Sequence, residues 1–210
     1  MQLYLVRHAQ SRANADFSCR DVDCELTALG CRQAELVAAE LRSQSIFQVL
    51  ASPYRRTVAT GREIAAAVGA PLALLPIAHE HHGIAPIGWI PSTRAELIWR
   101  YPDLPLLGDV PETTWHQLPE TYDQVATRMR EALATLRSHY GNAERVVLVS
   151  HASPIQQLIG VATGGYTPLE ATRLAIDNAS LTVLNLALTP ARVEVLGRSE
   201  FLNVAEPVLR

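Results

Sequence analysis

The sequence predicts an α/β fold, a three-layer sandwich in which helices cover both faces of a mostly parallel central sheet. Short apolar runs of strand length alternate with longer segments of helical spacing, the pattern expected of a parallel sheet. The run Val146 to Val149 is aliphatic and unbroken, as in a strand buried on both faces. The 210 residues, 48% of them hydrophobic, suffice for one sizeable core but not for two large domains. We therefore expect a single domain over residues 1–210.

Each element follows from a local signal. Strands are expected where apolar residues alternate or run together, at 2–6, 46–51, 72–75, 145–150, 181–188 and 192–196. The last two form a hairpin that turns at Thr189-Pro190. Thr27 is suited to cap a helix that runs to residue 41, and Gly69 to close one that Ser52-Pro53 opens. Two further helices are expected, one with its apolar face over 122–136 and one over 153–161.

Residues 79–120 have no regular pattern apart from a short helical patch at 93–100. Prolines interrupt this segment at Pro86, Pro91, Pro102, Pro105, Pro111 and Pro119. A long irregular segment between regular elements is typical of a functional loop. We expect an insertion that acts as a lid and determines substrate choice, not a linker between domains.

Composition excludes several kinds of chemistry. All 18 basic residues are arginine, since the sequence contains no lysine, which excludes a Schiff-base lysine and a phosphate-loop lysine. The sequence contains no run of basic residues, so no nucleic-acid partner is expected. The longest apolar stretch is broken by Pro71 and Pro76 and is too short for a bilayer, so no membrane partner is expected. Three cysteines and no secretory signal favour a cytoplasmic protein. The sequence does not fix the oligomeric state.

Residues suited to phosphate chemistry follow three of the expected strands. Arg7-His8 ends the first strand, Ser52 to Arg56 follows the second, and Ser150-His151 ends the central one. Because ligands of parallel sheets bind beyond the carboxyl ends of the strands, these groups should share one rim. Arginine binds phosphate oxygens bidentately, neutral histidine can attack phosphorus, and a carboxylic acid can protonate the leaving oxygen. The pattern predicts a site for a phosphoryl group.

Five segments resemble the histidine phosphatase superfamily, which includes the cofactor-dependent phosphoglycerate mutases. They are Leu5 to Asn14; Leu26-Thr27 with Gly30 and Gln33-Ala34; Ser52, Tyr54, Arg56 and Thr60; Val147 to His151; and Asn178 to Ser180. Together they span nearly the whole chain in the family's order. The resemblance implies a phosphoglycerate mutase-like sandwich.

The resemblance also implies a role for each matching residue. His8 is the nucleophile that forms a phosphohistidine, and Glu80, after the third strand, is the acid. The phosphate-binding residues are Arg7, Asn14, Arg56 and His151. Arg56 fits the second-arginine position better than Arg55, which we expect to be a solvated helix residue. The resemblance implies a small phosphorylated substrate, with no metal and no other cofactor.

Three positions depart from the family pattern. Ala9 and Ala152 stand where the family usually has glycine. If either backbone needs a positive φ, alanine costs on the order of 1 kcal/mol; otherwise its methyl group narrows the pocket floor. Glu80 precedes the next glycine by one residue fewer than the pattern, so Glu96 and Asp109 are reserve candidates for the acid.

Three functions are weighed. The leading one is a metal-independent phosphomonoester hydrolase acting through phosphohistidine, a histidine acid-type phosphatase. The alternative is a cofactor-dependent phosphoglycerate mutase, which must bind a carboxylate and a second phosphate. Between residues 80 and 119 only Arg94 and Arg100, besides histidines, could supply those cations, which favours hydrolysis. The second alternative is a phosphate-ligand binding protein that has lost turnover through the two alanines.

Two further features of the irregular segment leave alternatives open. The run His79 to His82 could hold a metal, contact substrate or be an ordinary solvated loop. Trp89, Trp99 and Trp115 could cap an apolar substrate pocket, although packing of the segment against the body is favoured.

Overall fold

A six-stranded sheet forms the centre of the computed structural model, which describes residues 1–16, 18–19, 21–83, 92–112 and 119–203. The strand order is β3-β2-β4-β1-β5-β6. The strands are β1 (Gln2–Arg7), β2 (Gln48–Ala51), β3 (Leu72–Leu74), β4 (Arg145–Ser150), β5 (Leu181–Asn185) and β6 (Arg192–Arg198). Parallel pairing joins β3, β2, β4 and β1, whereas β5 and β6 add antiparallel pairs at one edge. The predicted mostly parallel sheet and the hairpin at its end are confirmed.

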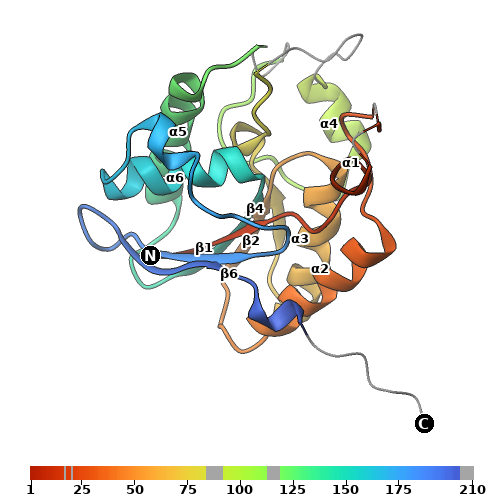
Figure 1. The fold of residues 1–210 in the computed structure, drawn as a ribbon, viewed down its shortest axis with the longest axis horizontal. Coiled ribbons are helices and arrows are strands. Elements are labelled where there is room, and N and C mark those ends of the chain that lie inside the picture. Colours follow the sequence, from red (N-terminus) through yellow and green to blue (C-terminus); the bar gives the residue numbers. More distant parts are fainter. Residues whose placement is uncertain (17, 20, 84–91, 113–118, 204–210) are drawn as a thin grey trace.

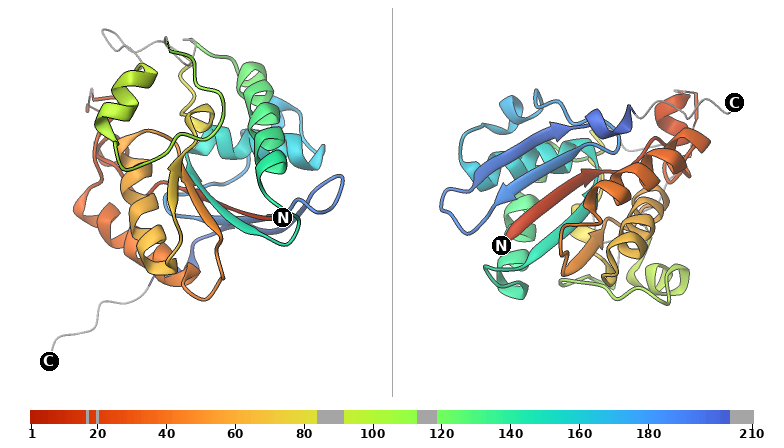
Figure 2. Two further views of the ribbon diagram at one scale, coloured as in Figure 1. Left: turned by 180° about the vertical axis from the view of Figure 1, so that it is seen from behind. Right: turned by 90° about the horizontal axis from the view of Figure 1, so that it is seen from below.

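Helices cover both faces of this sheet (Figures 1 and 2). The helices are α1 (Arg12–Ala15), α2 (Ala28–Leu41), α3 (Arg55–Val68), α4 (Arg94–Arg100), α5 (Tyr122–His139), α6 (Ala152–Thr163) and α7 (Pro168–Ala171), with 3-10 turns at Pro76–Ala78 and Glu200–Leu202. One face carries α2 and α3, and the other carries α5 and α6. None of the helices among the described residues combines the length and apolar character needed to cross a membrane.

The side chains of the two central strands, β1 and β4, alternate between the two faces of the sheet, so each strand contributes to two separate cores. One core, under α5 and α6, takes Leu3, Leu5, Val146 and Leu148; the other, under α2 and α3, takes Tyr4, Val6, Val147 and Val149. Fully burying an aliphatic side chain contributes about 1.5–3 kcal/mol relative to leaving it exposed. This explains why β4 is apolar at successive positions, and it fixes the strands whose ends carry the site.

Helix boundaries follow the expected capping residues. The Thr27 side chain accepts a hydrogen bond from the Gly30 amide at the start of α2, and Gly69 ends α3 in the left-handed conformation. In the irregular segment, α4 begins with a reciprocal cap between Thr93 and Glu96. Trp99, on this helix, is 83% exposed, so the expectation that it packs the segment against the body is wrong. Trp89 and Trp115 lie outside the described residues.

Candidate active site

The candidate site lies at the carboxyl edge of the sheet, where the ends of three strands are in register. Arg7 pairs with Ser150, and Ala51 pairs with Val149, so the residues that follow β1, β2 and β4 meet. A cavity of about 250 Å³ opens there. It is lined by His8, Ser11, Ala13, Asn14, Cys19, Asp21, Val22, Arg56, Glu80 and His82. Four residues expected from the sequence, His8, Asn14, Arg56 and Glu80, therefore line one cavity, and His151 contacts three of them, His8, Arg56 and Glu80.

His8 is held as a neutral imidazole with one nitrogen directed at the arginine. Its ring is 2% exposed, and Nδ1 lies 2.7 Å from the Ala9 carbonyl oxygen, which can only accept, so Nδ1 carries the proton. Nε2 accepts a hydrogen bond from Arg56 Nε at 3.2 Å. Burial, and then the charges of Arg56 and Arg7, lower the His8 pKa well below its ordinary value. An unprotonated Nε2 is the form that can attack phosphorus.

His151 lies beside His8, with the two rings edge to face and their centroids 5.1 Å apart. Its Nε2 lies 2.9 Å from Ser52 Oγ, and its Nδ1 lies 3.3 Å from Arg56 Nη2 and 3.4 Å from a Glu80 oxygen. Burial is the main cause that lowers the His151 pKa, followed by the charge of Arg56. A phosphoryl dianion would offset that charge and favour the protonated ring.

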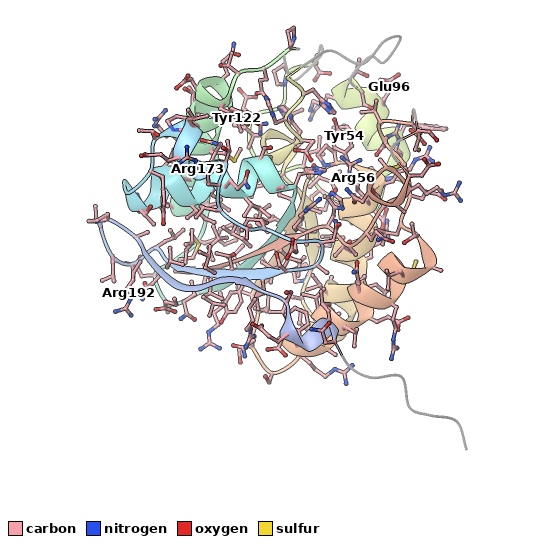
Figure 3. All side chains as sticks on the ribbon, viewed as in Figure 1. Tyr54, Arg56, Glu96, Tyr122, Arg173 and Arg192 are labelled. Atoms are coloured by element: carbon pink, nitrogen blue, oxygen red, sulfur yellow. The ribbon has the colours of Figure 1, made fainter. Side chains whose placement is uncertain are left out.

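Arg56 is the centre of the site. Its guanidinium donates to the Val22 carbonyl through Nη1 at 2.9 Å and lies 4.6 Å from the centre of the Tyr54 ring. Its Nε donates to His8, and its Nη2 faces His151. Phosphoryl oxygens would bind at this position. Figure 3 shows Tyr54 and Arg56 close together at this edge of the sheet. The fork is therefore oriented before any ligand arrives, which reduces the entropy lost on binding.

Arg7 approaches the site from β1 but is not among the residues that line this cavity. Its Nη1 donates to the Ile176 carbonyl at 2.8 Å. Its Nε is buried and makes no hydrogen bond within the part of the chain that the structure describes. A buried donor without a partner is unfavourable. Arg7 lines a separate cavity of about 530 Å³, together with Asp177 and Asn178.

Asn14 lines the cavity from α1, the short helix that comes after the loop following His8. Its Oδ1 accepts from the Ser11 amide at 3.1 Å, the Ser11 hydroxyl at 2.9 Å and Asn178 Nδ2 at 3.2 Å. Asn178 Nδ2 also donates to the His8 carbonyl at 3.0 Å. Because Oδ1 is fully engaged, the amide NH₂ is the group that Asn14 can offer to a ligand.

Glu80 lines the same cavity and contacts His151. One carboxyl oxygen accepts from the His81 amide at 2.9 Å, and the other faces His151 Nδ1. Burial raises the Glu80 pKa above its ordinary value, so the carboxyl retains its proton more readily, as a general acid requires. Burial raises the pKa of Glu80 and lowers the pKa of His151, so it disfavours an ion pair between these two residues.

The two reserve candidates for the acid do not line this cavity. Glu96 caps α4 through Thr93, whose hydrogen bonds lower the Glu96 pKa, and Figure 3 shows it apart from Arg56. Asp109 lines a separate cavity of about 450 Å³. Of the three carboxylates considered from the sequence, only Glu80 reaches the histidines.

The family model of the histidine phosphatase superfamily (branch 1) matches residues 3–198. The chain belongs to this superfamily. It is 34% identical over 196 residues to the probable phosphoglycerate mutase GpmB of Photorhabdus laumondii, covering 90% of this chain and 87% of that protein. It is 29% identical over 189 residues to phosphoserine phosphatase 1 of Hydrogenobacter thermophilus, covering 89% and 87%.

Solved structures show the same fold at lower sequence identity. A mycobacterial glucosyl-3-phosphoglycerate phosphatase superposes with a TM-score of 0.69 at 22% identity, over 94% of this chain and 99% of that one. A phosphoserine phosphatase of Entamoeba histolytica, solved with 3-phosphoglyceric acid, superposes with a TM-score of 0.69 at 19% identity, over 96% and 98%. Curated relatives of this chain are thus named as phosphatases and as phosphoglycerate mutases.

The second segment that resembles the histidine phosphatases fixes the loop that follows His8. Thr27 Oγ1 donates to Gln10 Oε1 at 2.8 Å, and Gln33 Oε1 accepts from the Gln10 amide at 2.9 Å. A Cβ atom on Gly30 would lie 2.0 Å from the Gln10 carbonyl oxygen, so only glycine fits. The resemblance at Thr27, Gly30 and Gln33 therefore has one physical reason, the clamping of the backbone two residues after His8.

The two alanines that replace family glycines do not distort the site. Among described residues other than glycine, a positive φ occurs only at Ser45 and Ala179. Ala9 is fully buried in the core under α2 and α3, and neither Ala9 nor Ala152 lines the cavity. Neither the conformational cost nor the narrowed pocket floor that the sequence suggested is present.

One group in the described chain has ligand atoms close enough for a metal ion. Atoms of His8, Glu80 and His151 all lie within 4.8 Å of one another. The Arg56 guanidinium, however, lies within hydrogen-bond distance of both histidines, so a cation would meet a fixed positive charge. The electrostatics favour an anion at this position.

The histidines of the 79–82 run form no such group among the described residues, because each ring has a different partner. His79 Nδ1 lies 2.9 Å from the Glu80 carbonyl, and His81 Nε2 lies 2.8 Å from the Glu120 carbonyl. His82 reaches the cavity, contacts the Tyr54 hydroxyl at 3.0 Å and has its pKa lowered by burial to about 4.

Sequence reasoning missed the part of the cavity wall formed by Cys19, Asp21 and Val22. The Val22 carbonyl that holds Arg56 is a backbone atom, and no residue type signals it. Asp21 and Cys19 also line the cavity. The signal that was available is position: these residues fall between two family segments that both reach the site.

Proposed function

We propose that the chain is a phosphomonoester hydrolase that acts through a phosphohistidine on His8, without a metal. The observation that carries this proposal is the tautomer of His8: Nδ1 is bound to the Ala9 carbonyl, so Nε2 is the unprotonated nitrogen and accepts a hydrogen bond from Arg56 Nε at the cavity. Arg56 lies on one side of that nitrogen, and Glu80 lines the same cavity. The arrangement supplies a nucleophile, a cationic clamp and an acid.

The proposed reaction consists of two in-line transfers. His8 Nε2 attacks phosphorus while the protonated Glu80 gives its proton to the leaving alcohol oxygen, and the phosphoryl group remains on His8. Glu80, now a carboxylate, accepts a proton from water, which attacks the phosphohistidine and releases phosphate. The equatorial oxygens are held by Arg7, Asn14, Arg56 and His151. Preoriented donors at these oxygens stabilise the transition state more than the ground state.

Two ion pairs favour hydrolysis over mutase activity. Residues 79–120 contain two arginines and no lysine. Arg94 pairs with Glu112 at 2.9 Å, Arg100 pairs with Asp23 at 2.8 Å, and neither lines the cavity. A mutase must bind a further anionic group of its substrate, and both of these arginines already form ion pairs with carboxylates of the chain. Glu80 and His82 do line the cavity, which supports our proposal that this segment selects the substrate within one domain.

Phosphoglycerate mutase activity is the second candidate, supported by the 34% identity to a probable phosphoglycerate mutase. It shares the first transfer and differs in returning the phosphoryl group to a second oxygen of the substrate. A binding protein without turnover has lost its support, because the two alanines leave the site undistorted.

The test is hydrolysis of p-nitrophenyl phosphate with excess chelator, by the wild type and by His8→Ala. We expect chelator-resistant hydrolysis in the wild type and at least a thousandfold loss in the variant, since removing a covalent nucleophile costs about 10³-fold or more. Equal activity in both proteins would refute the proposal. Isomerisation of 3-phosphoglycerate faster than its hydrolysis would instead establish the mutase.

A further inference from the structure

Asp23 joins three parts of the molecule next to the cavity. One of its carboxylate oxygens accepts from the Arg55 amide at 2.7 Å, in the first turn of α3. The other accepts from Arg100 Nη1 at 2.8 Å, on α4. The side chain is only 18% exposed, and the Arg55 side chain lies 3.8 Å from it. A single carboxylate thus links the cavity wall, α3 and the 79–120 segment.

These contacts hold Arg56 from both ends. At the backbone end, Asp23 caps the first turn of the 14-residue helix α3, whose own N-cap residue, Tyr54, makes no side-chain capping bond. At the guanidinium end, the carbonyl of the adjacent Val22 accepts from Arg56 Nη1. Displacing residues 22–23 would therefore release the fork and the helix that carries it together.

We propose that Asp23 is a positioning residue for Arg56, and that Arg100 couples α4 to the phosphoryl site through it. This inference rests on the proposed function, since it assigns the site to phosphoryl binding. It explains why a helix of the substrate-selecting segment is tied to the wall that orients the phosphate clamp. A displacement of α4 on substrate binding would reach the Arg56 guanidinium through the Arg100–Asp23 ion pair, the Val22–Asp23 peptide unit and the hydrogen bond from Arg56 to the Val22 carbonyl.

The direction of the change in phosphate affinity distinguishes a positioning role of Asp23 from a purely electrostatic one. Asp23 is an anion close to an anion site, so removing its charge alone would tighten phosphate binding. If Asp23 acts by orienting Arg56, removing it weakens phosphate binding instead. The two roles thus predict opposite changes in the same dissociation constant.

The chain offers a matched control. Arg62 on α3 binds Asp103, just beyond α4, through Nη2 at 3.0 and 2.8 Å. This pair also ties α3 to the 79–120 segment, but both side chains are about half exposed and neither lines the cavity. Asp103→Ala therefore removes a comparable link without touching the wall at residues 22–23.

The experiment measures the dissociation constant of inorganic phosphate by calorimetry in the wild type, Asp23→Ala and Asp103→Ala. We expect Asp23→Ala to weaken binding about tenfold, the size of a lost hydrogen bond to a charged group, and Asp103→Ala to change it less than about twofold. Arg100→Gln, which leaves the helix cap in place, provides a milder variant and should weaken binding about threefold. Thermal unfolding confirms that each variant is folded.

A thermodynamic cycle tests whether the effect passes through Arg56. In an Arg56→Lys background, which lacks the fork, Asp23→Ala should have no further effect on phosphate affinity. Additive losses, or tighter binding by Asp23→Ala, would overturn the inference and leave the proposed function standing. A wild type that neither binds phosphate nor hydrolyses p-nitrophenyl phosphate would overturn the proposed function, and this inference with it.

Discussion

Replacing Glu80 with glutamine removes the proton of the proposed acid while keeping the shape of the side chain. The amide oxygen of the introduced glutamine can still accept from the His81 amide, as the Glu80 carboxyl does at 2.9 Å. The substitution should therefore remove only the proton that the acid donates. General acid catalysis contributes about 10²–10⁴-fold, so we expect kcat/KM for an alkyl phosphate such as glycerol 3-phosphate to fall by that factor.

The same substitution should affect an aryl phosphate far less. The p-nitrophenolate group leaves without a proton, so kcat/KM for p-nitrophenyl phosphate should fall less than about tenfold. By contrast, kcat should fall for both substrates, because both pass through the same phosphohistidine, whose hydrolysis also uses Glu80. The phosphoenzyme should accumulate in the Glu80→Gln variant.

The assay is steady-state kinetics on both substrates from pH 4 to 9. The pKa of Glu80 is raised, so the wild type should lose alkyl phosphate hydrolysis as the pH rises through that value, and the variant should lack this alkaline limb. Equal losses of kcat/KM for the two substrates would refute the role of Glu80 as the acid, since a purely structural defect does not distinguish leaving groups.

Three further predictions concern stability and the supports of the site. Gly30→Ala forces a Cβ to 2.0 Å from the Gln10 carbonyl, so we expect a loss of about 1–3 kcal/mol in the free energy of unfolding and a fall in kcat; urea unfolding showing wild-type stability would contradict the clamp. Glu120→Gln removes the charged partner of the buried Arg128, which lies 2.7 Å away in the wild type, and should lower the free energy of unfolding by about 3 kcal/mol. Removing the exposed Arg32–Glu35 pair should lower it by less than about 1 kcal/mol in the same urea measurement. Thermal stability should fall as the pH drops below about 6.5, because histidines of the unfolded chain then become protonated whereas the same histidines stay neutral when buried in the folded protein. A thermal unfolding midpoint that does not change between pH 7 and 5 would contradict the lowered pKa values of His8, His82 and His151.

Most of the fold could be predicted because the central elements carry strong periodic signals. The buried strand β4 and the amphipathic helix α5 have apolar patterns set by the two cores. The helices α1 and α7 have four residues each, too few for a hydrophobic period, and were not predicted. Strand β5 ends at Asn185, short of the predicted Leu188, because an apolar run continues past its last paired residue.

The principal groups of the site could be predicted because strand order places them. His8, Arg56 and His151 follow strands whose carboxyl ends lie in register, so position along the chain implies proximity. The support of Arg56 could not be predicted in the same way. Its contact with Val22 spans 34 positions and uses a carbonyl, and the Arg100–Asp23 pair spans 77 positions. Neither contact has a sequence period or motif.

The decisive experiment traps the phosphoryl group on the protein. Wild type, Glu80→Gln and His8→Ala are mixed with ³²P-labelled p-nitrophenyl phosphate, whose leaving group needs no proton from Glu80. The reactions are quenched in alkali within milliseconds and digested, and the labelled peptide is sequenced. We predict label on the peptide that contains His8, stable in alkali and lost in acid, with more label in Glu80→Gln and none in His8→Ala. Acid-stable label, or label that persists in His8→Ala, would contradict the phosphohistidine mechanism.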